Sequence, residues 1–130
     1  MSKKILIIDD EADIRTFLET LLKENGFETV TASDGDKGLD AVKEFRPDAI
    51  TLDIIMPKET GVKFYRTLLK DPDLQDIPVI ILSGVTRYKE LFARDHKTMH
   101  KPFAFVEKPI HPEELLAKVN EAIAAGAKAK

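Results

Sequence analysis

Residues 3–10 of this chain read KKILIIDD, in which four consecutive apolar residues end in two carboxylates. Three later stretches have the same form, an apolar run followed by a polar side chain, and their runs cover residues 49–52, 79–82 and 103–106. Continuous apolar runs of this length are typical of strands buried on both faces, as in a parallel sheet covered by helices. A fifth run, residues 27–32, alternates more, which is the pattern of an edge strand.

Helical patterns separate these runs. Apolar residues recur at helical spacing in four segments, within residues 14–22, 39–45, 62–69 and 115–123. Helix-ending residues follow the first three segments and Pro112 opens the last; the endings are Asn25-Gly26, Pro47 and Pro72. A weaker apolar stripe predicts one more helix within residues 85–101. Strand and helix alternating five times predict an α/β fold, a three-layer doubly wound parallel sheet of the (βα)5 type.

Length and composition restrict the class of protein. The chain has 130 residues, a length typical of one domain, and a net charge of −3. This balance argues against direct nucleic-acid binding, which usually requires a basic excess. The absence of cysteine excludes disulfides and thiolate metal sites. No apolar run is long enough for a signal peptide or a membrane span, so we expect a cytoplasmic protein.

Polar residues follow the buried runs, and the carboxyl ends of parallel strands meet at one edge of a sheet, where such folds bind ligands. These residues are Asp9, Asp10, Asp53, Ser83 and Lys108. Three carboxylates ~5 Å apart would repel one another by about 3 kcal/mol a pair at an effective dielectric of ~20. A lysine and a divalent cation would offset this repulsion, and hard oxygen ligands suit Mg²⁺. The pattern predicts phosphoryl transfer to a carboxylate nucleophile.

Each of these residues also has a simpler interpretation. Asp10 could be only the N-cap of the first helix, and Ser83 could cap the helix that follows it. Asp53 could merely open a turn, and Lys108 could be an ordinary surface charge. Their joint placement at one edge of the sheet favours a functional site over four independent coincidences.

The motifs resemble the receiver domain of two-component response regulators. They are Asp9-Asp10, Asp53-x-x-Met56-Pro57-x-x-x-Gly61, Ser83-Gly84 and Lys108-Pro109, in that order. The resemblance implies a flavodoxin-like sheet with strand order 2-1-3-4-5 and a receiver domain over residues 3–125, with a frayed tail at 126–130. It also implies a phosphoacceptor switch in a phosphorelay rather than an enzyme with independent substrate turnover.

The resemblance assigns roles by position. Asp53 would accept the phosphoryl group and help to bind Mg²⁺. Asp10 would bind the ion directly, Asp9 directly or through water, and the backbone carbonyl of Ile55 would supply a further ligand. Lys108 would pair with the phosphoryl group.

Further roles concern the response to phosphorylation. Ser83 would bind a phosphoryl oxygen and draw its loop inward, and Phe105 matches the position of an aromatic switch residue. The Lys108–Pro109 peptide would be cis. Apolar side chains at Ile55 and Val85 would flank the path of an attacking water, which predicts slow loss of the phosphoryl group.

Other functions fit the chain less well. A phosphatase or phosphotransferase resembling the haloacid dehalogenase family needs an acid two residues after the nucleophile, where this chain has Ile55. A flavodoxin-type cofactor module would need a phosphate-binding loop after the first strand, where this chain has Asp9-Asp10-Glu11. A pseudo-receiver would lack an acid or the lysine, and all are present.

The expected partners follow from the resemblance alone. A histidine kinase or phosphotransfer protein would donate the phosphoryl group. An output protein or output domain would read the active state, and phosphorylation could promote a homodimer. The sequence identifies none of these partners.

Overall fold

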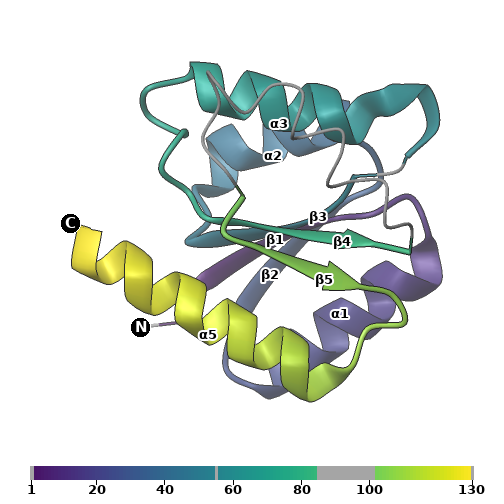
Figure 1. Ribbon diagram of the computed structural model, residues 1–130, viewed down its shortest axis with the longest axis vertical. Helices are drawn as coiled ribbons and strands as arrows, with labels where there is room; N and C mark the ends of the chain where they lie inside the picture. Colours follow the sequence, from purple (N-terminus) through teal and green to yellow (C-terminus); the bar gives the residue numbers. More distant parts are fainter. Residues whose placement is uncertain (1, 55, 85–101, 130) are drawn as a thin grey trace.

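Five parallel strands form one sheet in the computed structural model, which describes residues 2–54, 56–84 and 102–129. The order across the sheet is β2-β1-β3-β4-β5 (Figure 1). The strands are β1 (Lys4–Ile8), β2 (Glu28–Ala32), β3 (Ala49–Asp53), β4 (Val79–Ser83) and β5 (Ala104–Glu107). The predicted α/β fold and its strand order are confirmed.

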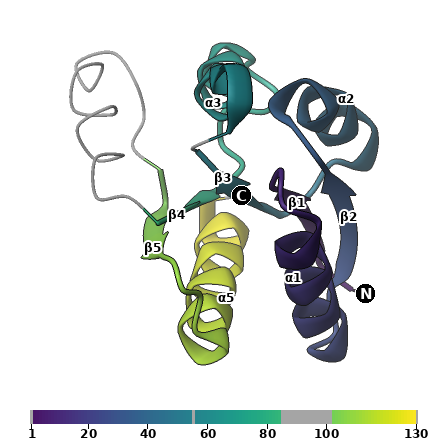
Figure 2. The same ribbon diagram turned by 90° about the vertical axis from the view of Figure 1, so that its right-hand side faces the viewer.

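Helices cover both faces of the sheet and complete three layers. Figure 2 shows α1 and α5 on one face and α2 and α3 on the other. The helices are α1 (Ala12–Glu24), α2 (Gly35–Phe45), α3 (Thr60–Lys70) and α5 (Pro112–Ala129), with a short 3₁₀ helix η1 (Pro57–Glu59) before α3. The helix predicted within residues 85–101 lies outside the described residues.

The helix ends follow the local sequence. Helix α1 ends before Asn25, and Gly26 adopts a φ of +88°, a conformation that glycine takes without strain. The Asp34 side chain caps α2 by accepting a hydrogen bond from the Lys37 N–H at 2.8 Å. Helix α5 continues to Ala129, so fraying of residues 126–130 and a domain limit at residue 125 stay predictions.

The central strands bury side chains on both faces. Alternate residues point to opposite sides of a strand, and every residue of β3 and β4 is buried. One apolar cluster packs under α2 and α3 and includes Leu6, Ile8, Ile50, Leu52, Ile81 and Phe64. The other packs under α1 and α5 and includes Ile5, Ile7, Ile80, Leu82, Leu18 and Val119. The two clusters explain why these runs are continuous.

The two edge strands differ from each other in how well the sequence predicted them. Strand β2 lies at one edge, as its alternation predicted. Strand β5 lies at the opposite edge, as the predicted strand order implies, but its continuous apolar run indicated burial on both faces, whereas Phe105 is half-buried and Glu107 exposed. A four-residue apolar run cannot distinguish an edge strand from a central one, because it carries no information on lateral neighbours.

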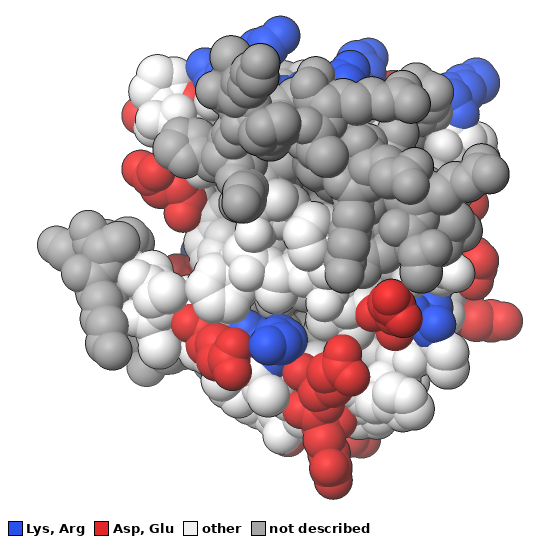
Figure 3. Space-filling view, in the orientation of Figure 1, with Lys and Arg blue, Asp and Glu red and all other residues white. Residues whose placement is uncertain are grey.

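Charges of both signs occur on the face seen in Figure 3. Basic side chains line its upper edge, where Figure 1 draws α3, and acidic and basic side chains mix over its lower half. The described residues on this face therefore do not form the extended basic surface typical of nucleic-acid-binding domains. In the described part of the chain, no helix has the length and apolar character needed to cross a bilayer.

Glycines bring α2 and α3 close to the end of β3. A Cβ added to Gly61 would lie 2.7 Å from the carbonyl oxygen of Asp53 and 2.8 Å from that of Ile54. A Cβ added to Gly35 would overlap the carbonyl oxygen of Thr60. The start of α3 thus packs main chain to main chain against the residues that surround Asp53.

Gly61→Ala should destabilise the fold by about 1–3 kcal/mol, because the new methyl group must displace backbone rather than a flexible side chain. Gly126→Ala, in α5, is the matched control because a Cβ there meets no described atom within 4 Å. It should stabilise the protein by about 0.5–1 kcal/mol. Urea unfolding measures the free energy of unfolding of both variants. Equal effects of the two substitutions would contradict the close packing of Gly61 against the main chain of Asp53 and Ile54.

Candidate functional site

Three carboxylates converge at the carboxyl ends of β1 and β3. Asp9 and Asp10 follow β1, Asp53 is the last residue of β3, and one oxygen of each lies within 4.8 Å of the others. The parallel register, in which Ile8 faces Leu52, brings the two strand ends level. Asp9 is fully buried, Asp53 is 3% exposed and Asp10 is exposed. The predicted acidic group therefore forms, with two of its members removed from water.

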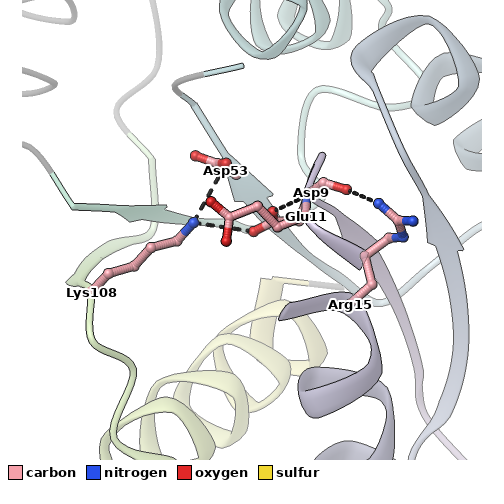
Figure 4. A network of polar contacts seen from close by, with 5 residues as sticks. All are labelled: Asp9, Glu11, Arg15, Asp53 and Lys108. Carbon is pink, nitrogen blue, oxygen red and sulfur yellow. Dashed lines mark hydrogen bonds and ion pairs between the residues drawn. The ribbon is translucent and has the colours of Figure 1, made fainter. Parts of the chain in front are cut away.

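Lys108 reaches this group from the end of β5. Its Nζ lies 3.3 Å from Oδ2 of Asp9 and 3.5 Å from Oδ2 of Asp53 (Figure 4). Burial of the ammonium lowers the pKa of Lys108, but the charges of Asp53 and Asp9 outweigh burial and raise the pKa above its ordinary value. The lysine is therefore charged at neutral pH and offsets part of the carboxylate repulsion.

Three hydrogen bonds hold the main chain around Asp9 in place. Oδ1 of Asp9 accepts from the Glu11 N–H at 2.9 Å, and the Asp9 N–H donates to the Ala32 carbonyl at 3.1 Å. Nη1 of Arg15 donates to the Asp9 carbonyl at 2.6 Å. The N-cap of α1 is Glu11 and not Asp10, so the interpretation of Asp10 as a mere cap is wrong.

Ser83 ends β4 next to the start of the Lys108 side chain. It is fully buried, and its carbonyl accepts from the Lys108 N–H at 2.9 Å. The Lys108–Pro109 peptide bond that follows is cis. Ser83 thus lies between the strand of the lysine and the strand of Asp53, at the same edge of the sheet as the acids.

Phe105 lies further from the acids. It is half-buried on β5 and packs against the apolar cluster under α2 and α3. Ile55 and Val85, for which a carbonyl ligand and the screening of water were predicted, lie outside the described residues.

Sequence reasoning missed Glu11 and Arg15. Glu11 contributes its N–H to Asp9 and adds a negative charge near Lys108. Arg15 occupies the second turn of α1, where long side chains point back toward the helix N-terminus. That direction, together with an acid pair just before the helix, was a signal that could have identified Arg15.

The chain matches the family model described as the response regulator receiver domain over residues 5–120. A probable transcriptional regulator, ycf27 of Guillardia theta, is 38% identical in an alignment of 123 residues that covers 90% of this chain and 44% of that protein. The phosphate regulon transcriptional regulatory protein PhoB of Escherichia coli is 33% identical over 119 residues, 92% of this chain and 51% of PhoB. The chain therefore spans about half the length of the curated relatives it matches.

Solved structures share the fold. A response regulator receiver domain protein from Clostridium thermocellum has a TM-score of 0.85 and 29% identity, over 98% of this chain and 99% of that one. The chemotaxis response regulator CheY4 of Vibrio cholerae has a TM-score of 0.81 and 27% identity, over 94% and 99% of the two chains.

Lys108→Met should destabilise the metal-free protein by roughly 2–3 kcal/mol, because it leaves the buried Asp9 and Asp53 carboxylates without their cation. Lys118→Met is the control, since Lys118 contacts Glu121 at 3.6 Å with both side chains well exposed. It should change the free energy of unfolding by less than about 0.5 kcal/mol. Urea unfolding in the presence of a chelator measures the free energy of unfolding of both variants. If Lys108→Met leaves this free energy unchanged, the proposed charge compensation is refuted.

Proposed function

This chain belongs to the response regulator receiver domains, and we propose that it works as a phosphoacceptor switch in which Asp53 takes the phosphoryl group. The observation that carries the proposal is the contact of Asp53 with the Lys108 ammonium inside a group of three carboxylates. A phosphoryl group on Asp53 would have a cation within reach at once, which supports transfer.

Asp53 is a better acceptor than either neighbouring acid. Asp9 has no exposed surface, and its two oxygens already accept from the Glu11 N–H and the Lys108 ammonium. Asp10 is exposed, and the described ion pairs of Lys108 are with Asp9 and Asp53 instead. Asp53 alone combines contact with the ammonium, a small opening to solvent and a place in the centre of the sheet.

The proposed transfer forms one bond and breaks one. A carboxylate oxygen of Asp53 attacks the phosphorus of a phosphohistidine, the bond between phosphorus and imidazole nitrogen breaks, and an aspartyl phosphate results. Attack by water on that phosphorus later restores the carboxylate and releases inorganic phosphate. The donor would be a histidine kinase or a phosphotransfer protein, as the family membership suggests.

Mg²⁺ is the cofactor that we propose for this site. The donor set fits, because Asp9, Asp10 and Asp53 offer hard oxygens within 4.8 Å of one another and, among the described residues, only the Lys108 ammonium forms ion pairs with them. Asp10 and Asp53 would bind the ion directly, Asp9 directly or through water, and the Ile55 carbonyl would complete the protein ligands. When bound, the ion would supply positive charge for the phosphoryl oxygens.

Ser83 and Phe105 would relay the signal. The register pairs Ile81 with Phe105 and Ser83 with Glu107, so Ser83 and Phe105 occupy the same face on adjacent strands, one pleat repeat apart. Movement of Ser83 toward a phosphoryl oxygen would change the packing beside the half-buried ring of Phe105. The phosphoryl group would thereby shift the balance between two conformations.

The remaining proposals concern the compartment, the partners and the lifetime of the phosphoryl group. The domain would act in the cytoplasm on an output protein or output domain, and phosphorylation could promote a homodimer. Slow loss of the phosphoryl group stays a prediction, because it depends on Ile55 and Val85.

A small acyl phosphate with Mg²⁺ should add one phosphoryl group to the wild-type protein and none to Asp53→Asn. The side-chain amide that this substitution introduces is not nucleophilic, which is why labelling should disappear. Asp36→Asn is the control, because Asp36 is an exposed acid that pairs with Lys63 on the surface, and it should be labelled like the wild type. Intact-mass spectrometry decides the matter, and equal labelling of Asp53→Asn would refute the assignment.

Ser83→Ala should leave labelling of Asp53 within about threefold of wild type but reduce the response of β5. A phosphoryl mimic with Mg²⁺ should shift the amide resonances of residues 104–107 in the wild type and shift them less in the variant, because the hydroxyl that draws the β4 end inward is gone. Two-dimensional NMR measures this. Identical shifts in both proteins would exclude Ser83 as the relay.

A further inference from the structure

We propose that Arg15 is a positioning residue that fixes the main chain on either side of Asp10 and so aims the Asp10 carboxylate at the cation site. The inference rests on the proposed function, because Asp10 matters only if it binds the ion. It concerns a side chain on α1 that is not itself a ligand.

Arg15 donates a hydrogen bond to the Asp9 carbonyl, which has no donor from the sheet. The Asp9 N–H donates to Ala32 of β2, so the Asp9 carbonyl faces the same side, and the pairing of β1 with β2 ends at Ile8 and Ala32 without a donor for that carbonyl. Arg15 is half-buried, runs back along α1 and donates to that carbonyl at 2.6 Å (Figure 4). Because the donor is a guanidinium, this hydrogen bond is charge-assisted, and such bonds are stronger than those between neutral groups.

Two peptide planes meet at the Cα of Asp10, and both are anchored. The plane between Asp9 and Asp10 contains the carbonyl that Arg15 binds. The plane between Asp10 and Glu11 contains the N–H that Oδ1 of Asp9 binds. Since these planes set φ and ψ of Asp10, they also set the direction in which its Cβ leaves the main chain.

Asp10 depends on this anchoring more than its neighbours do. Asp9 and Asp53 are each held by the Lys108 ammonium. The Asp10 side chain is exposed and makes no hydrogen bond or ion pair to any described residue. Its carboxylate is therefore placed by its own main chain, which leaves both oxygens open to a cation.

An electrostatic role and a positioning role of Arg15 predict opposite changes in Mg²⁺ binding when Arg15 is removed. If Arg15 acted only as a positive charge near the site, its removal would strengthen the attraction for Mg²⁺. If Arg15 places Asp10, its removal weakens Mg²⁺ binding, by about tenfold as is usual for a residue that orients a metal ligand. The sign of the change therefore distinguishes positioning from electrostatics.

Arg15→Met tests the proposal because it keeps the alkyl stem and removes the donor. Lys23→Met is the matched control: it removes the same charge from the same helix about 12 Å away, at a site with an exposed 3.7 Å contact to Glu19. Arg15→Gln is a second variant in case the first does not fold. NMR titration of each metal-free protein with Mg²⁺ gives its dissociation constant, and Asp10→Asn identifies the site.

Both Arg15 variants should bind Mg²⁺ about tenfold more weakly than wild type, and Lys23→Met within twofold. The amide resonances of Asp10 and Glu11 should also move in the metal-free Arg15 variants. Unchanged or tighter binding in these variants, with Mg²⁺ bound normally by wild type, would overturn the role of Arg15 and leave the proposed function intact. A wild type that binds no Mg²⁺ would overturn both.

Discussion

The ammonium of Lys108 between the carboxylates of Asp9 and Asp53 is the contact that the arrangement of the site depends on. Asp9 and Asp53 are removed from water, which is costly for a carboxylate unless a cation compensates it. Lys108 lies 99 positions from Asp9 in the chain, so the contact ties the last strand to the first. Because β4 separates β5 from β3, the side chain must cross the end of β4, where Ser83 and Gly84 are small.

Among the described residues, the single ammonium in contact with the three carboxylates cannot neutralise them, and the excess of two negative charges shapes what the site can do. Addition of a phosphoryl group would make the imbalance worse, whereas a divalent cation would relieve it. Binding of the cation and attachment of the phosphoryl group should therefore favour each other, and by linkage the preference is reciprocal. By the same reasoning, the contacts of Lys108 with Asp9 and Asp53 should stabilise the group of acids in the folded protein.

The sequence predicted those parts of the fold and site that depend on strand ends. Apolar runs located the strands, and since parallel strands end at one edge, Asp9, Asp53 and Lys108 could be brought together without coordinates. The partial exposure of β5 and the contact of Arg15 could not be found that way. Burial of an edge strand depends on its neighbours, and an arginine bound to a main-chain carbonyl leaves no trace in hydrophobic periodicity.

The two sides of the acceptor strand differ in how freely they can move. On the side of α2 and α3, Gly61 packs against the carbonyls of Asp53 and Ile54, and Gly35 packs against Thr60, so main chain meets main chain. Close-packed backbone is barely compressible, so movement on this side requires a concerted shift of whole helices. On the side of β4 and β5, the contacts are a long lysine side chain and a half-buried Phe105. Rotation of side chains costs less free energy than displacement of helices. A structural change at Asp53 should therefore move residues of β4 and β5 more than it moves α2 and α3.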